Sequence, residues 1–139
     1  MLPDVCAAIV QILGTALIYD VYGEELPSQG GTMPRKCIVV SAAGGFGARS
    51  FLTINNLRVD VRCYGESPSE ARQVWREVYE VLKTFQSATV VVDGSEDVKV
   101  LSIYEESSAF SSRDPDTKWP FTTGLWNVMA RDVPSVVGS

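Results

Sequence analysis

A strand that leads directly into a helix is the feature that most constrains the fold of this chain. Residues 57–64 alternate apolar and polar side chains without exception. The apolar positions are Leu57, Val59, Val61 and Cys63, and the charged positions are Arg58, Asp60 and Arg62. Such alternation is typical of an antiparallel strand with one buried and one uncovered face. We therefore expect the charged positions to face solvent or a neighbouring subunit.

A capping box starts the helix that follows. Gly65 breaks the strand, and Ser67-Pro68-Ser69-Glu70 combines an N-cap serine with a proline at the first helical position. We expect the Ser67 hydroxyl to accept a hydrogen bond from the Glu70 N–H, and the Glu70 carboxylate to accept one from the Ser67 N–H. The helix is predicted to run to about Gln86. Its apolar face consists of Ala71, Val74, Trp75, Val78, Leu82 and Phe85.

The same periodicities predict the remaining elements. An apolar stripe predicts another helix from Pro3 to about Gly14. In residues 98–106 the apolar phase shifts between Val100 and Leu101, which indicates a β-bulge. Further strands are predicted at residues 16–22, 37–41, 89–92 and 121–131. The segments between them are predicted as loops at 23–35 and 107–120, a flexible glycine-rich arm at 42–50 and a loose tail at 132–139.

The order helix, strands, helix, strands predicts an α+β fold. We expect a single domain over residues 1–139, built as a mainly antiparallel β-sheet with two α-helices packed on one face. A chain of 139 residues buries enough apolar surface to fold without a disulfide or a metal ion.

Composition excludes several kinds of site. The chain has no histidine, which removes Ser-His-Asp triads and histidine-based zinc centres. Its three cysteines, Cys6, Cys37 and Cys63, are widely spaced and are expected to be reduced thiols in the core. The net charge of -5 argues against tight nonspecific binding to nucleic acid. No apolar run reaches the roughly 18 residues needed to cross a bilayer.

Two acidic features are candidate sites. Asp114-Pro115-Asp116 resembles the start of a calcium loop, but the glycine and terminal glutamate of an EF-hand are missing, so a turn is expected. Glu105 and Glu106 are adjacent on a predicted strand, so they point to opposite faces and do not share a proton. We therefore expect no catalytic, cofactor-binding or metal-ligating residue, and no cofactor.

The order of these elements resembles the tail terminator and tail completion proteins of long-tailed bacteriophages. The resemblance covers about residues 5–131. An N-terminal helix leads through a segment with Pro27 and Pro34 to the strand CIVV at 37–40. After a glycine-rich insertion, the glycine-ended strand LRVDVRCYG at 57–65 is followed at once by the helix ESPSEARQVWREVYEVL at 66–82.

This resemblance implies a tail-terminator-like fold and a structural protein that is not an enzyme. Proteins of this kind form a ring, usually of six copies, at the head-proximal end of the tail tube. The ring ends tube polymerisation and docks to the head–tail connector. The implied partners are further copies of the chain, the tail tube protein and the connector or stopper protein, and DNA passes through the lumen without specific binding. The implied location is the virion tail or neck, with assembly in the host cytoplasm and no membrane contact.

Five residues are candidates for the contacts between subunits. Phe46 and Arg49 lie on the glycine-rich arm, where long loops can reach a neighbour and become ordered on contact. Arg58, Asp60 and Arg62 lie on the uncovered face of strand 57–64.

Two alternatives stay open. One is another neck component, such as a head-completion or connector subunit. The other, of a different class, is a small enzyme or ligand-binding module that uses Cys63 or the Asp114 and Asp116 loop. This second alternative predicts a thiol of lowered pKa or a bound metal ion.

Overall fold

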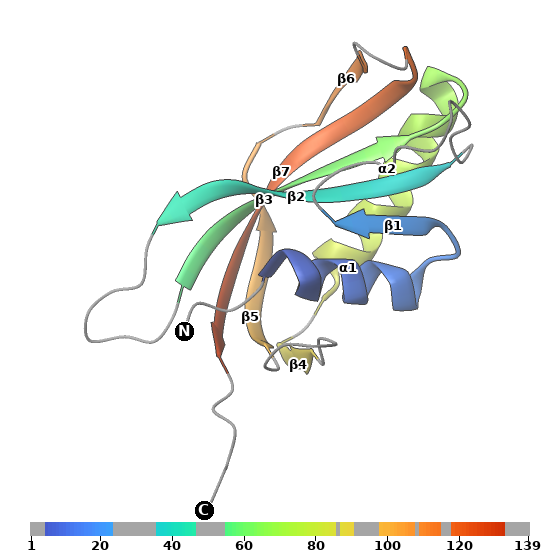
Figure 1. Ribbon diagram of the computed structural model, residues 1–139. Coiled ribbons are helices and arrows are strands. Elements are labelled where there is room, and N and C mark those ends of the chain that lie inside the picture. The colour runs from blue at the N-terminus through green and yellow to red at the C-terminus, as the bar shows by residue number, and fades with distance from the viewer. Residues whose placement is uncertain are drawn as a thin grey trace, which may run out of the picture.

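The computed structural model describes residues 5–23, 36–46, 55–85, 87–90, 98–107, 109–114 and 118–132. In these residues two helices lie against one curled, mainly antiparallel sheet (Figure 1). The predicted α+β fold is therefore confirmed. The elements are α1 (Val5–Ala16), β1 (Asp20–Gly23), β2 (Cys37–Phe46), β3 (Asn55–Tyr64), α2 (Pro68–Lys83), β4 (Ala88–Val90), β5 (Val98–Glu105), β6 (Phe110–Arg113) and β7 (Pro120–Asp132).

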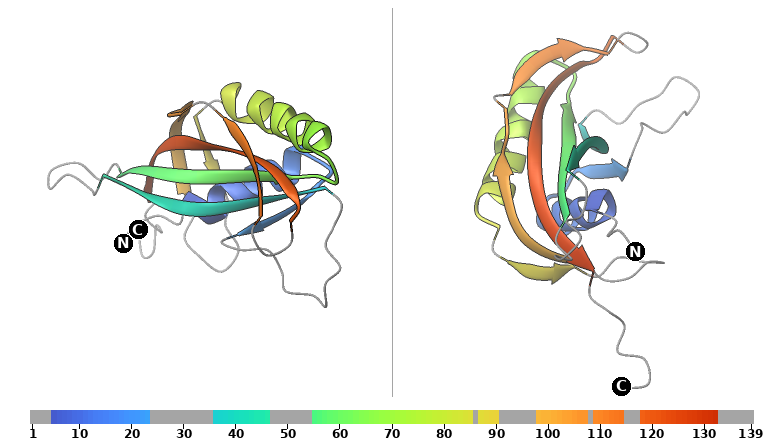
Figure 2. Two further views of the ribbon diagram at one scale, coloured as in Figure 1. Left: turned by 90° about the horizontal axis from the view of Figure 1, so that it is seen from above. Right: turned by 90° about the vertical axis from the view of Figure 1, so that its left-hand side faces the viewer.

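The longest strand, β7, joins the two halves of the sheet. The strand order is β1-β2-β3-β7-β5-β4, and β6 also pairs with β7. On one side β7 pairs with all ten residues of β3. On its other side it pairs first with β6 and then with β5, so β5 and β6 together form one interrupted strand along it (Figure 2). Among the described strand pairs only β1 and β2 run parallel.

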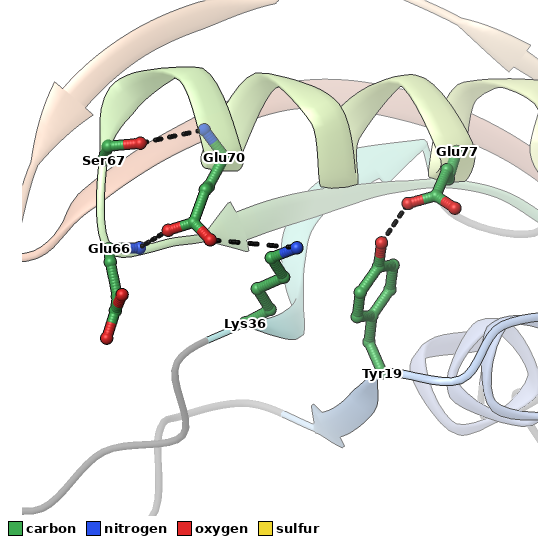
Figure 3. Close-up of polar contacts among 6 residues, drawn as sticks. All are labelled: Tyr19, Lys36, Glu66, Ser67, Glu70 and Glu77. Atoms are coloured by element: carbon green, nitrogen blue, oxygen red, sulfur yellow. Dashed lines mark hydrogen bonds and ion pairs between the residues drawn. The ribbon is translucent and has the colours of Figure 1, made fainter.

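Both helices pack on the same face of the sheet, as the sequence predicts. Buried side chains of α1 and α2 share one apolar cluster with the strands: Val5, Ile9, Leu13, Val74, Val78, Leu82, Ile38, Val40, Val59, Val61, Cys63, Trp126 and Val128 are among its members. The Tyr79 ring of α2 lies 5.7 Å from the Trp126 ring of β7. The Tyr19 hydroxyl, just before β1, donates to the Glu77 carboxylate of α2 (Figure 3). Burial of these side chains is the main favourable contribution to folding.

A second, smaller cluster lies on the opposite face. Cys37, Val39, Tyr64 and Phe121 are buried there, and Tyr22 and Trp119 pack against them. The cluster sits where β7 begins and β3 ends, because Tyr64 and Phe121 are paired in the register of the two strands. One end of the helix-free face is thus apolar, and the charged positions of β3 lie beside it.

The start of α2 differs from the expected capping box in one bond. The Ser67 hydroxyl accepts from the Glu70 N–H at 3.2 Å, as predicted. The Glu70 carboxylate, however, accepts from the N–H of Glu66 at 3.0 Å and forms an ion pair with Lys36 at 3.8 Å (Figure 3). The turn before this helix is tight, since a Cβ added at Gly65 would lie only 2.7 Å from both the Ala71 nitrogen and the Glu70 Cβ.

The flexible-arm prediction for 42–50 is wrong for residues 42–46. These residues complete β2 and pair with β3, with a register shift between Ala42 and Gly45. Consecutive glycines fit such a shift because they tolerate the irregular backbone of a bulge. Residues 47–50 lie outside the described part of the chain.

The loop prediction for 107–120 is also wrong in part, because β6 lies within it. All four residues of β6 are exposed, so the strand shows no apolar alternation. Its backbone pairing with β7, in the register Phe110 with Thr123, holds it in place instead. The bulge predicted in 98–106 is confirmed by the register shift between Val100 and Ser102.

Smaller differences affect the ends of elements. Helix α1 continues to Ala16, so the strand expected from residue 16 begins only at Asp20 and includes Gly23. Helix α2 ends at Lys83, where Thr84 caps it. Asp132, assigned to the tail, is the last residue of β7. Residues 24–35, 86, 91–92 and 133–139 lie outside the described part.

Replacing Gly65 by alanine should strongly destabilise the fold, because the new Cβ would lie 2.7 Å from backbone and side-chain atoms of α2. We expect a loss of about 2 kcal/mol or more in the free energy of unfolding, measured by urea denaturation. Gly14→Ala is the matched control, since a Cβ at this helical position meets nothing within 4 Å. This control should gain about 0.5–1 kcal/mol. Equal effects of the two substitutions would contradict the close packing at Gly65.

Candidate subunit interface

The face of the sheet opposite the helices, called the open face here, carries the three charged candidates of β3. Arg58, Asp60 and Arg62 alternate with the buried residues Val59, Val61 and Cys63, as predicted. Each charge has an opposite charge beside it. The Arg58 Nε lies 2.7 Å from a carboxylate oxygen of Glu106, and the Arg62 Nε lies 3.3 Å from Asp60 Oδ2. The two arginines and two carboxylates cancel, so this part of the open face has no net charge.

Neighbouring side chains hold these charges in position. The Thr123 hydroxyl of β7 donates to Asp60 Oδ1. The Arg62 guanidinium lies over the Phe121 ring, 5.1 Å from its centroid, at the distance of a cation–π contact. Hydrogen bonding to Tyr64, and to a lesser degree the charge of Asp60, raises the pKa of Arg62. The Tyr64 hydroxyl also donates to Asp114 at 3.3 Å. Asp60 and Arg62 are therefore connected to the small apolar cluster through Phe121 and Tyr64. Arg58, Asp60 and Arg62 are called the charged row below.

The structure places one of the two arm candidates. Phe46 is the last residue of β2 and pairs with Asn56 of β3, two residues before Arg58. Arg49 lies outside the described part of the chain. The structure thus brings Arg58, Asp60 and Arg62 together and places the backbone of Phe46 at the end of the same strand pair.

Two exposed aromatic residues on the open face were not among the candidates. Tyr104 of β5 pairs with Asn127, and Phe110 of β6 pairs with Thr123. Because Asn127 and Thr123 share the face of Arg58 and Arg62, both aromatic side chains belong to the open face. The sequence signal for Phe110 is an aromatic residue isolated in the polar run SSAFSSR. Such a run is typical of a loop, so the sequence alone did not indicate strand β6.

The cysteines are placed as core residues. Cys6, Cys37 and Cys63 are buried and form no disulfide, and the Cys6 thiol donates to the Val40 carbonyl at 3.1 Å. Burial, followed by the charge of Asp20, raises the pKa of Cys37 to about 12. Burial also raises the pKa of Cys63. A nucleophilic thiol needs the opposite shift, so the environment of Cys63 does not suit the role considered for it.

The acidic candidates take structural positions. Asp114 begins the turn between β6 and β7, where its carbonyl accepts from the Lys118 N–H at 2.8 Å. Asp116 lies outside the described residues. Glu105 is exposed at the end of β5, and Glu106 pairs with Arg58. Within the described ranges no three His, Cys, Asp or Glu side chains gather as a metal site, and no helix there is long and apolar enough to cross a membrane.

Comparisons with known proteins do not assign the chain to a family. No protein family matches it, and no curated protein matches its sequence.

The buried thiols should make the protein less stable at alkaline pH. Below the ordinary thiol pKa of 9.0 the thiols are neutral in both the folded and unfolded chain. As the pH rises from 9.0 toward about 12, the unfolded chain loses these protons while folded Cys37 keeps its own, so the free energy of unfolding falls. Urea denaturation between about pH 8 and pH 10 should show this fall, and a shallower one in the Cys37→Ala/Cys63→Ala variant. Identical slopes for the two proteins would contradict this account.

The Asp60 carboxylate should matter more for folding than the Arg62 side chain. Arg62 is 42% exposed, so Arg62→Ala should cost less than about 1 kcal/mol in thermal or urea denaturation. Asp60→Ala removes the acceptor of the Thr123 hydroxyl, a residue only 4% exposed, and should cost about 1–3 kcal/mol. Asp60→Asn keeps an acceptor oxygen and should recover most of that loss. An Arg62→Ala loss as large as that of Asp60→Ala would contradict the ranking.

Proposed function

We propose that this chain is a structural subunit that assembles into a hexameric ring and serves as the tail terminator of a long-tailed bacteriophage. The ring would end polymerisation of the tail tube and join the tail to the head–tail connector. The observation that carries the proposal is the one-sided fold: both helices cover one face, and the other face presents charges that are paired with opposite charges. The resemblance in element order supports the same function.

Charge neutralisation on the open face favours contact between copies. Each chain carries a net charge of -5, so two copies repel each other at long range. A contact through Arg58, Glu106, Asp60 and Arg62 adds no further repulsion, because these charges already cancel. Unlike contact surfaces on one subunit produce a ring when the rotation between neighbours closes.

The acidic character of the chain also suits a channel for DNA. A strongly basic lumen would bind phosphates and slow the passage of DNA. The proposal therefore expects acidic or neutral side chains to line the channel. A ring with a basic lumen would contradict this part of the proposal.

Electron microscopy of the purified protein with tail tubes tests the function. We expect rings, or ring-shaped caps at one end of tubes assembled from the tail-tube protein encoded in the same genome. Arg62→Glu places a second negative charge beside Asp60 on the open face and should reduce capping at least several-fold. Arg76→Glu makes the same charge change on the exposed side of α2 and is the matched control.

Three outcomes separate the candidates. A chain that stays monomeric and binds no tubes would contradict the proposal. Rings that bind purified connectors but never tubes would indicate another neck component instead. Equal capping by Arg62→Glu and Arg76→Glu would exclude the charged row from the contacts.

A further inference from the structure

Three large hydrophobic side chains are strongly exposed in the described part of the chain, and they lie at the two margins of the sheet. These residues are Ile18, Tyr104 and Phe110, with exposed fractions of 95%, 48% and 61%. Tyr104 and Phe110 lie at one margin of the sheet, on β5 and β6. Ile18 lies at the other, in the turn between α1 and β1, two residues before β1 begins.

The margin at β5 and β6 is an open strand edge in the described residues. Strand β4 covers only Val98–Val100 of β5. From Leu101 to Arg113 no described strand pairs with the outer side of β5 or β6. Tyr104 and Phe110 stand along this edge on the open face, on either side of Glu106. In the described residues this edge therefore has backbone N–H and C=O groups without a strand partner, and two aromatic rings stand beside them.

The margin at β1 is the other end of the sheet. Strand β1 pairs with residues Cys37–Val40 of β2 on one side, and no described strand pairs with its other side. In the right-hand view of Figure 2, β1 and the β4–β5 pair lie on opposite sides of the long arc of β7. The two edges are thus opposite margins of one sheet and are unlike in chemistry, with an exposed aliphatic side chain at one and two exposed aromatic rings at the other.

Unlike edges on one subunit define how copies can associate. An open strand edge is a template for another strand, since its N–H and C=O groups point outward. Pairing between two different edges is heterologous, and repetition of such a contact gives a closed ring or a filament. Every copy carries both halves of this contact, which makes a second copy of the chain the occupant that fits.

We propose that the β1 edge of one copy docks on the β5–β6 edge of the next, with Ile18 packed against Tyr104 and Phe110. This inference rests on the proposed ring and names its subunit contact. It places Arg58, Asp60 and Arg62 of β3 on the same face as the aromatic rings but two strands further from the edge, beyond β7. The charged row then lies at the margin of the contact, and the two aromatic rings lie at its centre.

Two substitutions, each disabling one edge, test the contact. Ile18→Asp leaves the β5–β6 edge intact, and Phe110→Asp leaves the β1 edge intact. Each variant alone should lose the ring, as measured by light scattering and native mass spectrometry. An equimolar mixture should form a one-to-one dimer and nothing larger. The intact β1 edge of Phe110→Asp can dock on the intact β5–β6 edge of Ile18→Asp, and the other edge of each variant is disabled. Gln73→Asp, on the exposed side of α2, is the control and should form rings like the unmodified chain.

The outcomes distinguish this inference from the function on which it rests. Both substituted side chains are exposed, so circular dichroism should show folded proteins. If the unmodified chain forms rings and both variants also do, the inference fails and the ring function stands. A mixture that stays monomeric, or that closes into full rings, also overturns the inference. If the unmodified chain never associates, with or without tail tubes, both proposals fail.

Discussion

Backbone pairing along β7 is the interaction on which the rest of the structure depends. Its thirteen residues hold β3 on one side and β5 and β6 on the other, so removal of this strand would separate the sheet into two parts. The same strand supplies Trp126 and Val128 to the core beneath the helices and Phe121 to the cluster on the open face. Because alternate residues of a strand face opposite sides, one strand joins both clusters into one cooperative unit.

The proposed assembly depends on the coverage of only one face of the sheet by helices. The two helices bury the apolar side of the sheet, and no described helix lies on the other side. On that side the charged residues are already neutralised by neighbours such as Glu106, and the exposed aromatic rings stand at an edge. In the described residues this surface combines paired charges, exposed aromatic groups and strand edges without a strand partner, and the proposed contact between copies uses these properties.

Periodicity in the sequence predicted most of the fold, because each buried face leaves a clear pattern. The alternation in 57–64 and the apolar stripe of 71–85 predicted β3 and α2, and the phase shift at Val100 predicted the bulge in β5. Strand β6 could not be found in this way, since its residues are all exposed and only pairing with β7 orders them. For the same reason Phe110 was missed as a surface residue, whereas Arg58, Asp60 and Arg62 were placed on the correct face. The position of Ile18 became informative only when the order of strands was known.

Hydrogen–deuterium exchange tests the central claim, that copies meet edge to edge, most directly. The outward-pointing amides of β1 and β6 should exchange rapidly in the monomeric Ile18→Asp variant, because no described strand covers the outer sides of these strands. In assembled rings of the unmodified chain, amides at both edges should become protected, and those of α2 should keep the same exchange rates. Rings in which β1 and β6 exchange as fast as in the monomer would contradict the account.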